Sequence, residues 1–205
     1  MLKESQSMTI QNNRNAASEA KQNIERWNRR IPIALEREQA TLPKKVRKHK
    51  VSFLEGLQQV FEILDRYADT ARGCVACRPG CSYCCHGEIA ISSLEAMLIS
   101  QASGRLAKTP SPSTGYRTKP SVESNRPCPL LGADGLCSVY EARPMVCRTH
   151  VNFASSNEAC KFDADPNGTI YMINRATSFP GAMRAWNELN QRAGAVLIDI
   201  REFFG

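Results

Sequence analysis

The spacing of apolar residues predicts a chain built mainly from helices. The clearest apolar stripe lies within residues 51–68, where apolar side chains recur every three or four positions, at Val51, Leu54, Leu57, Phe61, Leu64 and Ala68. Gly73 follows at the position expected of a C-cap glycine. A second stripe runs through residues 23–39, where Pro32 indicates either one kinked helix or two short ones.

Two capping boxes predict the starts of further helices. Ser92 and Glu95 have the spacing at which a serine hydroxyl and a glutamate each bind a free backbone N–H group, and apolar positions continue beyond them. Ser138 and Glu141 repeat this spacing ahead of one or two helical turns, which Pro144 should end.

The C-terminal part of the chain carries another helical pattern. Apolar spacing typical of a helix extends over residues 183–204, with Pro180 and Gly194 as breaks. A turn is expected at residues 165–168, and only residues 88–92 indicate a strand.

The remaining segments set the domain organisation. Residues 1–22 are polar and are predicted to be disordered, residues 41–50 form a basic hinge, and residues 104–127 form a loop insertion. We therefore predict a single domain over residues 23–205, with helices packed around an irregular cysteine-rich metal-binding core at residues 74–165.

Composition narrows the class of protein. The 205 residues include 27 basic and 20 acidic side chains, for a formal net charge of +7, and the 12 glycines and 11 prolines follow no period. These features exclude a collagen-like chain. No apolar run approaches the ~20 residues of a membrane-spanning helix, and the N-terminus has no apolar signal segment. The prediction is a cytoplasmic protein that does not contact a membrane.

The nine cysteines are the most informative residues of the chain. A secreted protein held by disulfides is one interpretation, which the odd number of cysteines and the missing export signal both disfavour. In a reducing compartment, clustered thiols are instead typical of metal ligands or redox centres.

The cysteines fall into two groups with the spacing of metal ligands. The first group is Cys74, Cys77, Cys81, Cys84 and Cys85, and the second is Cys128, Cys137, Cys147 and Cys160. Short loops between cysteines let two thiolates converge on one ion, at about 2.3 Å from each sulfur. Zinc and iron, the latter also as an iron–sulfur cluster, are the cofactors expected.

The adjacent pair Cys84–Cys85 constrains the geometry of such a site. Neighbouring side chains point apart, so both can hardly bind one tetrahedral ion. The pair would more naturally serve two ions, or two irons of a cluster, and eight thiols could then form two four-cysteine sites. The alternative is one ligand beside one buried structural thiol.

Two segments resemble the CxxCxxCC family of zinc- or iron-chelating, YkgJ-like cysteine-cluster proteins. Residues 77–85 read CRPGCSYCC, and residues 128–148 read CPLLGADGLCSVYEARPMVCR, with the cysteines, the tyrosine and the Arg-Pro pair in the order of the family. Residues 157–160 are similar to the trailing cysteine of the family. One spacing departs from the family pattern, since three residues separate Cys77 from Cys81.

The metal ligands that we predict are Cys77, Cys81, Cys84, Cys85, Cys128, Cys137, Cys147 and Cys160. Cys74 is an additional thiol, which leaves open whether Cys74 or Cys77 is a ligand. His86 and His150 could each complete a site of three cysteines and one histidine, or lie beside it. The nearby cations Arg72, Arg78, Arg143 and Arg148 could lower thiol pKa values or could be solvated. For Tyr140, ordinary packing is expected.

Three classes of function follow. The resemblance favours a metal-binding accessory or structural protein, without an assigned reaction. An iron–sulfur redox or protein-modifying enzyme is an alternative, because a flagellin lysine methylase is similar in its cysteine block. The third class is a zinc-stabilised adaptor for nucleic acid or protein. Nucleic acid is the less favoured partner, since no aromatic residue interleaves with the basic residues Lys44, Lys45, Arg47, Lys48 and Lys50.

Overall fold

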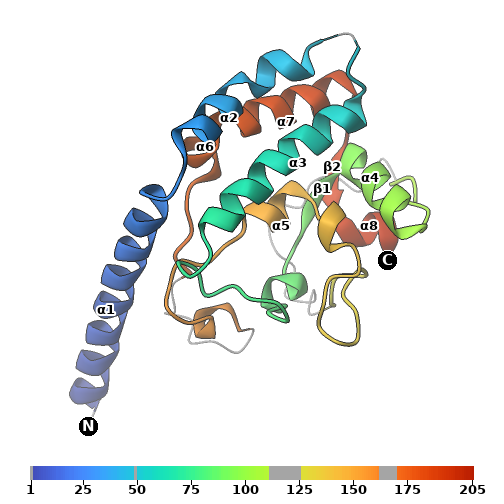
Figure 1. Cartoon of the computed structure of the whole chain (residues 1–205). Helices are drawn as coiled ribbons and strands as arrows, with labels where there is room; N and C mark the ends of the chain where they lie inside the picture. Colours follow the sequence, from blue (N-terminus) through green and yellow to red (C-terminus); the bar gives the residue numbers. More distant parts are fainter. Residues whose placement is uncertain (1, 49, 111–125, 162–169) are drawn as a thin grey trace.

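The computed structural model describes residues 2–48, 50–110, 126–161 and 170–205, and it confirms a mainly helical protein. Three helices form one layer, in which α2 (Ile33–Val46), α3 (Phe53–Thr70) and α7 (Pro180–Arg192) pack against one another (Figure 1). The loops that carry most of the cysteines gather on one side of this layer, below α5 (Met145–Thr149) in Figure 1.

Helix α3 follows the strongest apolar stripe of the sequence. Its start is fixed by a capping box, in which Glu55 donates its N–H to the Ser52 hydroxyl at 3.2 Å and the Glu55 carboxylate accepts the Ser52 N–H at 2.8 Å. Beyond its end, Gly73 adopts a positive φ of 73° and turns the chain toward the first cysteines.

Four aromatic side chains join the helical layer to the segment that follows α5. The Trp27 ring lies 5.3 Å from Phe153 and 6.1 Å from Phe179, and Tyr67 lies 5.1 Å from Phe179, measured between ring centroids. All four residues are buried in one apolar cluster. Aromatic pairs of this kind contribute about 1 kcal/mol each beyond their buried area, so the chain after α5 is anchored to the helices.

The N-terminal segment differs from its predicted disorder. The structure has a helix, α1 (Leu2–Asn28), which projects from the body and contacts the helical layer near its C-terminal end (Figure 1). Ala20 and Trp27 on that end are buried, at 1% and 3% exposure. The segment is rich in Ala, Gln, Glu and Lys, whose helix propensity is high even where no apolar stripe is present.

The predicted hinge at residues 41–50 is wrong over its first half. Helix α2 continues through Pro43 to Val46. Proline offers no N–H to the carbonyl of Gln39, and Gly181 of α7 packs directly on this carbonyl, where an added Cβ would lie 2.0 Å from the oxygen. The tight contact between α2 and α7 therefore stabilises a helix that contains a proline.

The C-terminal pattern is divided into more elements than the sequence predicts. After α7 and the positive-φ Gly194, strand β2 (Leu197–Asp199) pairs antiparallel with β1 (Ala90–Ser92), and α8 (Ile200–Phe204) follows. The strand predicted at residues 88–92 is thus confirmed, whereas its partner was missed. A strand of three residues is too short for its alternation to be distinguished from a helical pattern.

The two predicted capping boxes have different outcomes. Ser92 and Glu95 form the box that begins α4 (Ser93–Ser103), as predicted. Ser138 forms no cap, because its hydroxyl donates to the Leu130 carbonyl at 2.9 Å and a 3-10 turn, η2 (Tyr140–Ala142), follows. The predicted cap is wrong, since the hairpin contact competes for the serine, whereas a single helical turn ahead of Pro144 is present as η2.

Some predictions concern segments that the structure covers only in part. The turn expected at residues 165–168 and most of the 104–127 insertion lie outside the described residues, and residues 104–110 and 126–127 carry no regular secondary structure. A further short helix, α6 (Arg175–Ser178), precedes α7. In the described ranges, no helix combines the length and apolar character needed to cross a bilayer.

Candidate metal centre

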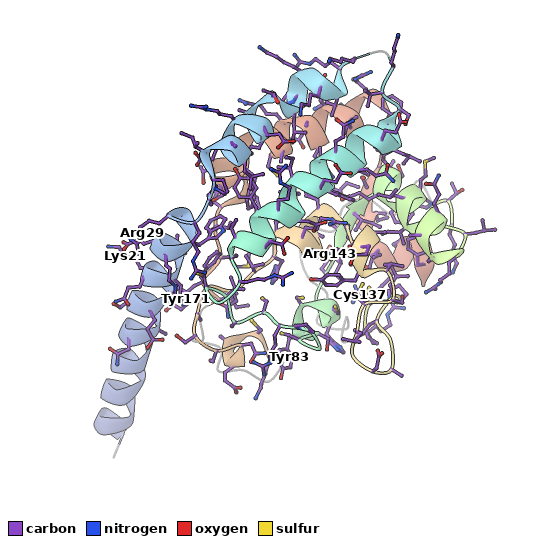
Figure 2. The ribbon with its side chains drawn as sticks, viewed as in Figure 1. Lys21, Arg29, Tyr83, Cys137, Arg143 and Tyr171 are labelled. Atoms are coloured by element: carbon purple, nitrogen blue, oxygen red, sulfur yellow. The ribbon has the colours of Figure 1, made fainter. Side chains whose placement is uncertain are left out.

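The predicted ligands lie on loops and short helices outside the three-helix layer. Cys77 and Cys81 lie in the loop after α3, Cys84 and Cys85 on η1 (Tyr83–His86), Cys128 and Cys137 around a hairpin, Cys147 on α5 and Cys160 on η3 (Glu158–Cys160). All nine cysteines of the chain are free thiols. Figure 2 shows Tyr83 and Cys137 on the same side of the helical layer.

Four of the cysteines form what we call the outer set, namely Cys77, Cys81, Cys84 and Cys160. Two asparagines connect three of them. Asn152 donates its backbone N–H to the Cys77 sulfur at 3.4 Å and its side-chain amide to the Cys160 sulfur at 3.5 Å. The amide of Asn157 donates to the Cys81 sulfur at 3.3 Å. Such N–H donors orient and stabilise thiolates around a metal.

The electrostatics of the outer set agree with this grouping. Burial of its sulfur raises the pKa of the Cys77 thiol, although the residue as a whole keeps exposed surface, and the Asn152 N–H opposes that rise. The neighbouring thiols Cys81, Cys84 and Cys160 raise the pKa of Cys77 further. Cys77 and Cys160 therefore each lie within electrostatic range of Cys81 and Cys84, as ligands of one ion would.

The other four predicted ligands, Cys85, Cys128, Cys137 and Cys147, form what we call the inner set. All four pack into the second apolar cluster of the protein, among residues of β1, α4 and α8. Cys128 donates its N–H to the carbonyl of Cys85 at 2.7 Å, and an isolated bridge between Leu131 and Cys137 closes the hairpin that carries Cys137. The inner set is therefore built into the core.

Burial dominates the electrostatics of the inner set. It raises the pKa of the Cys147 thiol, and the charges of Cys84, Cys128 and Cys137 raise that pKa further. Burial and the nearby Cys137 also raise the pKa of Cys128, which the Arg201 guanidinium opposes. Several thiols at such close quarters can all ionise only if a cation neutralises them.

The two sets meet at the adjacent pair Cys84 and Cys85. A hydrogen bond between the two thiols lowers the pKa of Cys84 to about 7 and raises that of Cys85. Cys84 is an electrostatic neighbour of Cys77 and Cys160 and also of Cys147, and Cys85 is a neighbour of Cys128 and Cys147. We place Cys84 in the outer set and Cys85 in the inner set, because neighbouring side chains point apart and would more naturally serve different ions.

The donor chemistry of both sets fits a thiophilic metal. Each set contains four sulfurs, the number that closes a tetrahedral zinc or iron site. Within the described ranges, no three His, Cys, Asp or Glu side chains are arranged as a ready group of ligands. The thiols are thus neighbours that share hydrogen-bond donors and electrostatic contacts.

Cys74 is placed apart from both sets. It is 1% exposed and lies in the apolar cluster of the helical layer. Its sulfur accepts hydrogen bonds from Arg26 Nε at 3.4 Å and from Arg30 Nη1 at 3.3 Å. These contacts connect the end of α1 to the turn after α3, and they favour Cys77 over Cys74 as the outer-set thiol.

The two candidate histidines flank the cysteines. His86 is half-buried at the end of η1, one residue beyond Cys85. His150 is half-buried after α5, where burial and then the charge of Arg175 lower its pKa. A neutral His150 is compatible with either alternative, ligand or neighbour.

Of the four arginines near the cysteines, Arg143 and Arg148 pair with Asp65 of α3, a contact that the sequence did not predict. Arg143 Nη2 lies 2.8 Å from the Asp65 carboxylate, and Arg148 pairs with the other oxygen of Asp65. The Arg148 side chain is 1% exposed and stacks on Phe61, with 4.3 Å from the guanidinium carbon to the ring centroid. In Figure 2, Arg143 lies between α3 and Cys137. The pair therefore attaches α5, and with it Cys147, to the helical layer.

The remaining residues of this group are exposed. Arg72 pairs with Asp69 at 2.8 Å with 84% of its side chain accessible, so its solvated alternative is confirmed. Arg78 is exposed in the loop between Cys77 and Cys81. The ring of Tyr140 packs against the Arg143 guanidinium at 4.0 Å, the ordinary packing expected.

The sequence did not reveal four of the side chains that position the thiols. Asn152 and Asn157 carry the N–H···S bonds of the outer set, and Arg201 donates to the Cys85 carbonyl at 3.2 Å. Glu95, recognised only as a capping residue, also accepts the Met145 N–H at 2.8 Å and thereby holds the start of α5. The only feature of the sequence that indicated a role for Asn152 and Asn157 was their position between Cys147 and Cys160.

Comparison with known proteins gives one match, which covers the cysteine-rich part of the chain. The profile of one family, CxxCxxCC, described as a putative zinc- or iron-chelating domain, matches residues 76–164, somewhat less than half of the chain. Searches of curated proteins and of solved structures gave no match. The matched segment contains both thiol sets and leaves out Cys74. Residues 76–164 are therefore similar to the CxxCxxCC family, whose domain is described as a putative zinc- or iron-chelating one.

Proposed function

We propose that this protein binds zinc or iron through eight cysteines arranged as two four-thiolate sites, the outer set and the inner set. The observation that supports the proposal is that N–H groups of Asn152 and Asn157 connect Cys77, Cys81 and Cys160, whereas Cys85, Cys128, Cys137 and Cys147 pack against the second apolar cluster. The metal crosslinks the cysteine segments, and the protein acts as a metal-binding accessory or structural protein.

The local structure around the thiols supports a structural role for the metal. The segments that carry the two sets contain only short elements, such as η1, η2, η3 and the five-residue α5. Isolated turns of this length are unstable in water without tertiary support. A structural zinc site supplies roughly 10–16 kcal/mol of apparent binding free energy, which is available as folding free energy.

Charge also favours metal-bound thiolates. Eight thiolates with two divalent ions contribute about −4, which the formal net charge of +7 more than offsets. The buried Arg201 supplies positive charge next to the inner set and opposes the raised pKa of Cys128. Free thiols in this number fit a reducing compartment, so we propose a cytoplasmic location.

If the bound metal is iron, it would supply one-electron redox chemistry, whereas zinc would supply a redox-inert crosslink. The role of the residues described here is the same in both cases. The cysteines bind the ion, Asn152 and Asn157 orient outer-set sulfurs, and Arg201 holds the Cys85 backbone.

The experiment is the metal content of protein purified under anaerobic conditions, with its visible spectrum and acid-labile sulfide. Zinc or iron at about two equivalents per chain is expected for two closed sites. Acid-labile sulfide with broad absorption near ~400 nm would replace single iron ions by an iron–sulfur cluster. A Cys74→Ser variant is the matched control and should keep the full metal content. Protein that is folded and free of metal would contradict the proposal.

A further inference from the structure

We propose that the two sites are unequal. The outer set is an exchangeable site that gives up its ion to a competing ligand, and the inner set retains its ion for as long as the domain stays folded. This inference rests on the proposed function, and it adds that the protein can transfer one of its two ions.

Exposure is the first difference between the sets. In the outer set, Cys77 and Cys84 are exposed, and Cys81 and Cys160 are half-buried. In the inner set, Cys128 is 8% exposed and the other three cysteines are half-buried against the apolar cluster. The outer cysteines therefore lie at the surface of the protein, where an incoming ligand can approach, whereas the inner cysteines pack against the apolar cluster.

The support of the backbone is the second difference. The inner set is held by main-chain contacts, since the Cys85 carbonyl accepts from Cys128 N–H at 2.7 Å and from Arg201 Nη2 at 3.2 Å. The Arg201 guanidinium also donates to the Arg126 carbonyl at 2.6 Å and pairs with Asp199 of β2 at 3.0 Å. Moving an inner thiol would therefore disturb the sheet and α8.

The outer set has a looser frame. Cys77 and Cys81 lie on either side of a turn at Gly80, which has a positive φ of 81° and at which an added Cβ would meet nothing within 4 Å. Cys81 and Cys160 are held by asparagine side chains, through N–H···S bonds of 3.3 Å and 3.5 Å. These bonds can break and reform without moving an element of secondary structure.

Exchange at the outer set is a ligand substitution without oxidation or reduction. A competing thiol or nitrogen chelator forms a bond to the ion as one metal–sulfur bond breaks, and the departing cysteine thiolate takes up the proton that the incoming thiol releases or one from water. The recipient is defined by chemistry alone, as a ligand with soft sulfur or nitrogen donors that can reach the outer cysteines at the surface.

The test measures zinc release from protein loaded with two equivalents of Zn²⁺, using the chromophoric chelator 4-(2-pyridylazo)resorcinol. Two kinetic phases of one equivalent each are expected, and the slow phase should coincide with unfolding measured by circular dichroism. Binding of fewer than two ions would contradict the proposed function. Binding of two ions that leave at a single rate before the protein unfolds would overturn this inference alone.

Substitutions assign the phases. Cys81→Ser should abolish the fast phase and leave the slow phase, and Cys137→Ser should abolish the slow phase; the reverse assignment would overturn the inference.

Because Cys137→Ser could unfold the domain, Asn157→Ala provides a milder test. It removes one N–H···S bond and should weaken zinc binding in the fast phase by about tenfold. A control, Asn190→Ala, removes a buried amide that bonds to the Trp186 carbonyl in α7 and should leave the fast phase unchanged. A change confined to the slow phase of Asn157→Ala would overturn the assignment.

Discussion

The N–H of Cys128 donates to the carbonyl of Cys85 at 2.7 Å, which joins the first cysteine group of the sequence to the second. The same carbonyl accepts a hydrogen bond from the buried Arg201. Two inner-set thiols that are distant in sequence are therefore brought together by the backbone, so the metal has to order fewer residues when it binds.

Arg201 is expected to be essential for this arrangement. Arg201→Ala leaves the Arg126 carbonyl and the Asp199 carboxylate without this partner, at a cost of about 2–3 kcal/mol in the free energy of unfolding. It should also lower zinc affinity at the inner set. Denaturant unfolding and competitive zinc titration measure the two effects. The control is Arg192→Ala, which removes a bond to the Val46 carbonyl and should leave zinc affinity unchanged. Equal affinity losses in both variants would contradict the role of Arg201.

The ion cluster at Asp65 should stabilise the attachment of α5 to α3. Asp65→Ala removes the partner of Arg143 and Arg148 at once. Breaking a fully buried pair costs ~3–5 kcal/mol, and the 34% exposure of the Asp65 side chain reduces our expectation to about 2 kcal/mol. Asp69→Ala is the matched control, because Asp69 pairs with the exposed Arg72 and its loss should have little measurable effect. Equal unfolding midpoints for the two variants would exclude a stabilising role for the cluster.

The side-chain amide of Asn152 should stabilise metal binding at the outer set, because it donates a hydrogen bond to the Cys160 sulfur. Asn152→Asp keeps an oxygen for the Ala154 N–H but replaces the amide near Cys160 with a negative charge. Repulsion between that carboxylate and the thiolates should weaken zinc binding at the outer set by roughly 10–100-fold. Asn174→Asp, at the start of α6, makes the same change where the side chain only caps a helix. Unchanged outer-set affinity in Asn152→Asp would show that the N–H···S bond does not stabilise the bound state.

Zinc binding should release protons near neutral pH. The pKa values of Cys77, Cys85, Cys128, Cys147 and Cys160 are raised above the ordinary value of 9.0, so these thiols are protonated at pH 7 in the metal-free protein. Cys84, with a pKa of about 7, is already partly ionised. Loading both sites should therefore release at least the protons of these five thiols, about five per chain.

The sign of the pH dependence follows from the same pKa directions. Protons compete with zinc for the thiols, so zinc affinity should rise with pH between 6 and 8 and fall on acidification. Proton release into a weakly buffered solution with an indicator dye, together with zinc titrations at several pH values, measures both effects. Release of fewer than about four protons, or an affinity that does not depend on pH, would contradict thiolate ligation at two sites.

Local signals in the sequence predicted the parts of the fold that depend on local interactions. The stripe of α3 and the Ser92–Glu95 box were found because a helix face and a cap involve residues three or four positions apart. The Ser138–Glu141 box has the same spacing but forms no cap, because the Ser138 hydroxyl donates to the Leu130 carbonyl on the other side of the hairpin. That competition arises from tertiary structure.

The candidate site, like the fold, has a part that local sequence signals predicted and a part that depends on tertiary structure. The spacing and adjacency of the cysteines predicted eight thiols and led to the hypothesis of two sites. Their assignment to an outer and an inner set depends on long-range contacts, such as that of Asn152 with Cys77. The pairing of Arg143 and Arg148 with Asp65 was also not predictable, because nothing near Asp65 in the sequence indicates a carboxylate that pairs with two arginines.

The most direct test of the central claim is the amount of metal bound to wild-type protein and to the Cys81→Ser and Cys137→Ser variants, each purified anaerobically. Two divided sites predict about two equivalents of zinc or iron in the wild type and about one equivalent in Cys81→Ser, with the helical layer still folded. Cys137→Ser should likewise lose the inner ion. Two equivalents in all three proteins, or none in the folded wild type, would contradict the division of the eight cysteines into two metal sites.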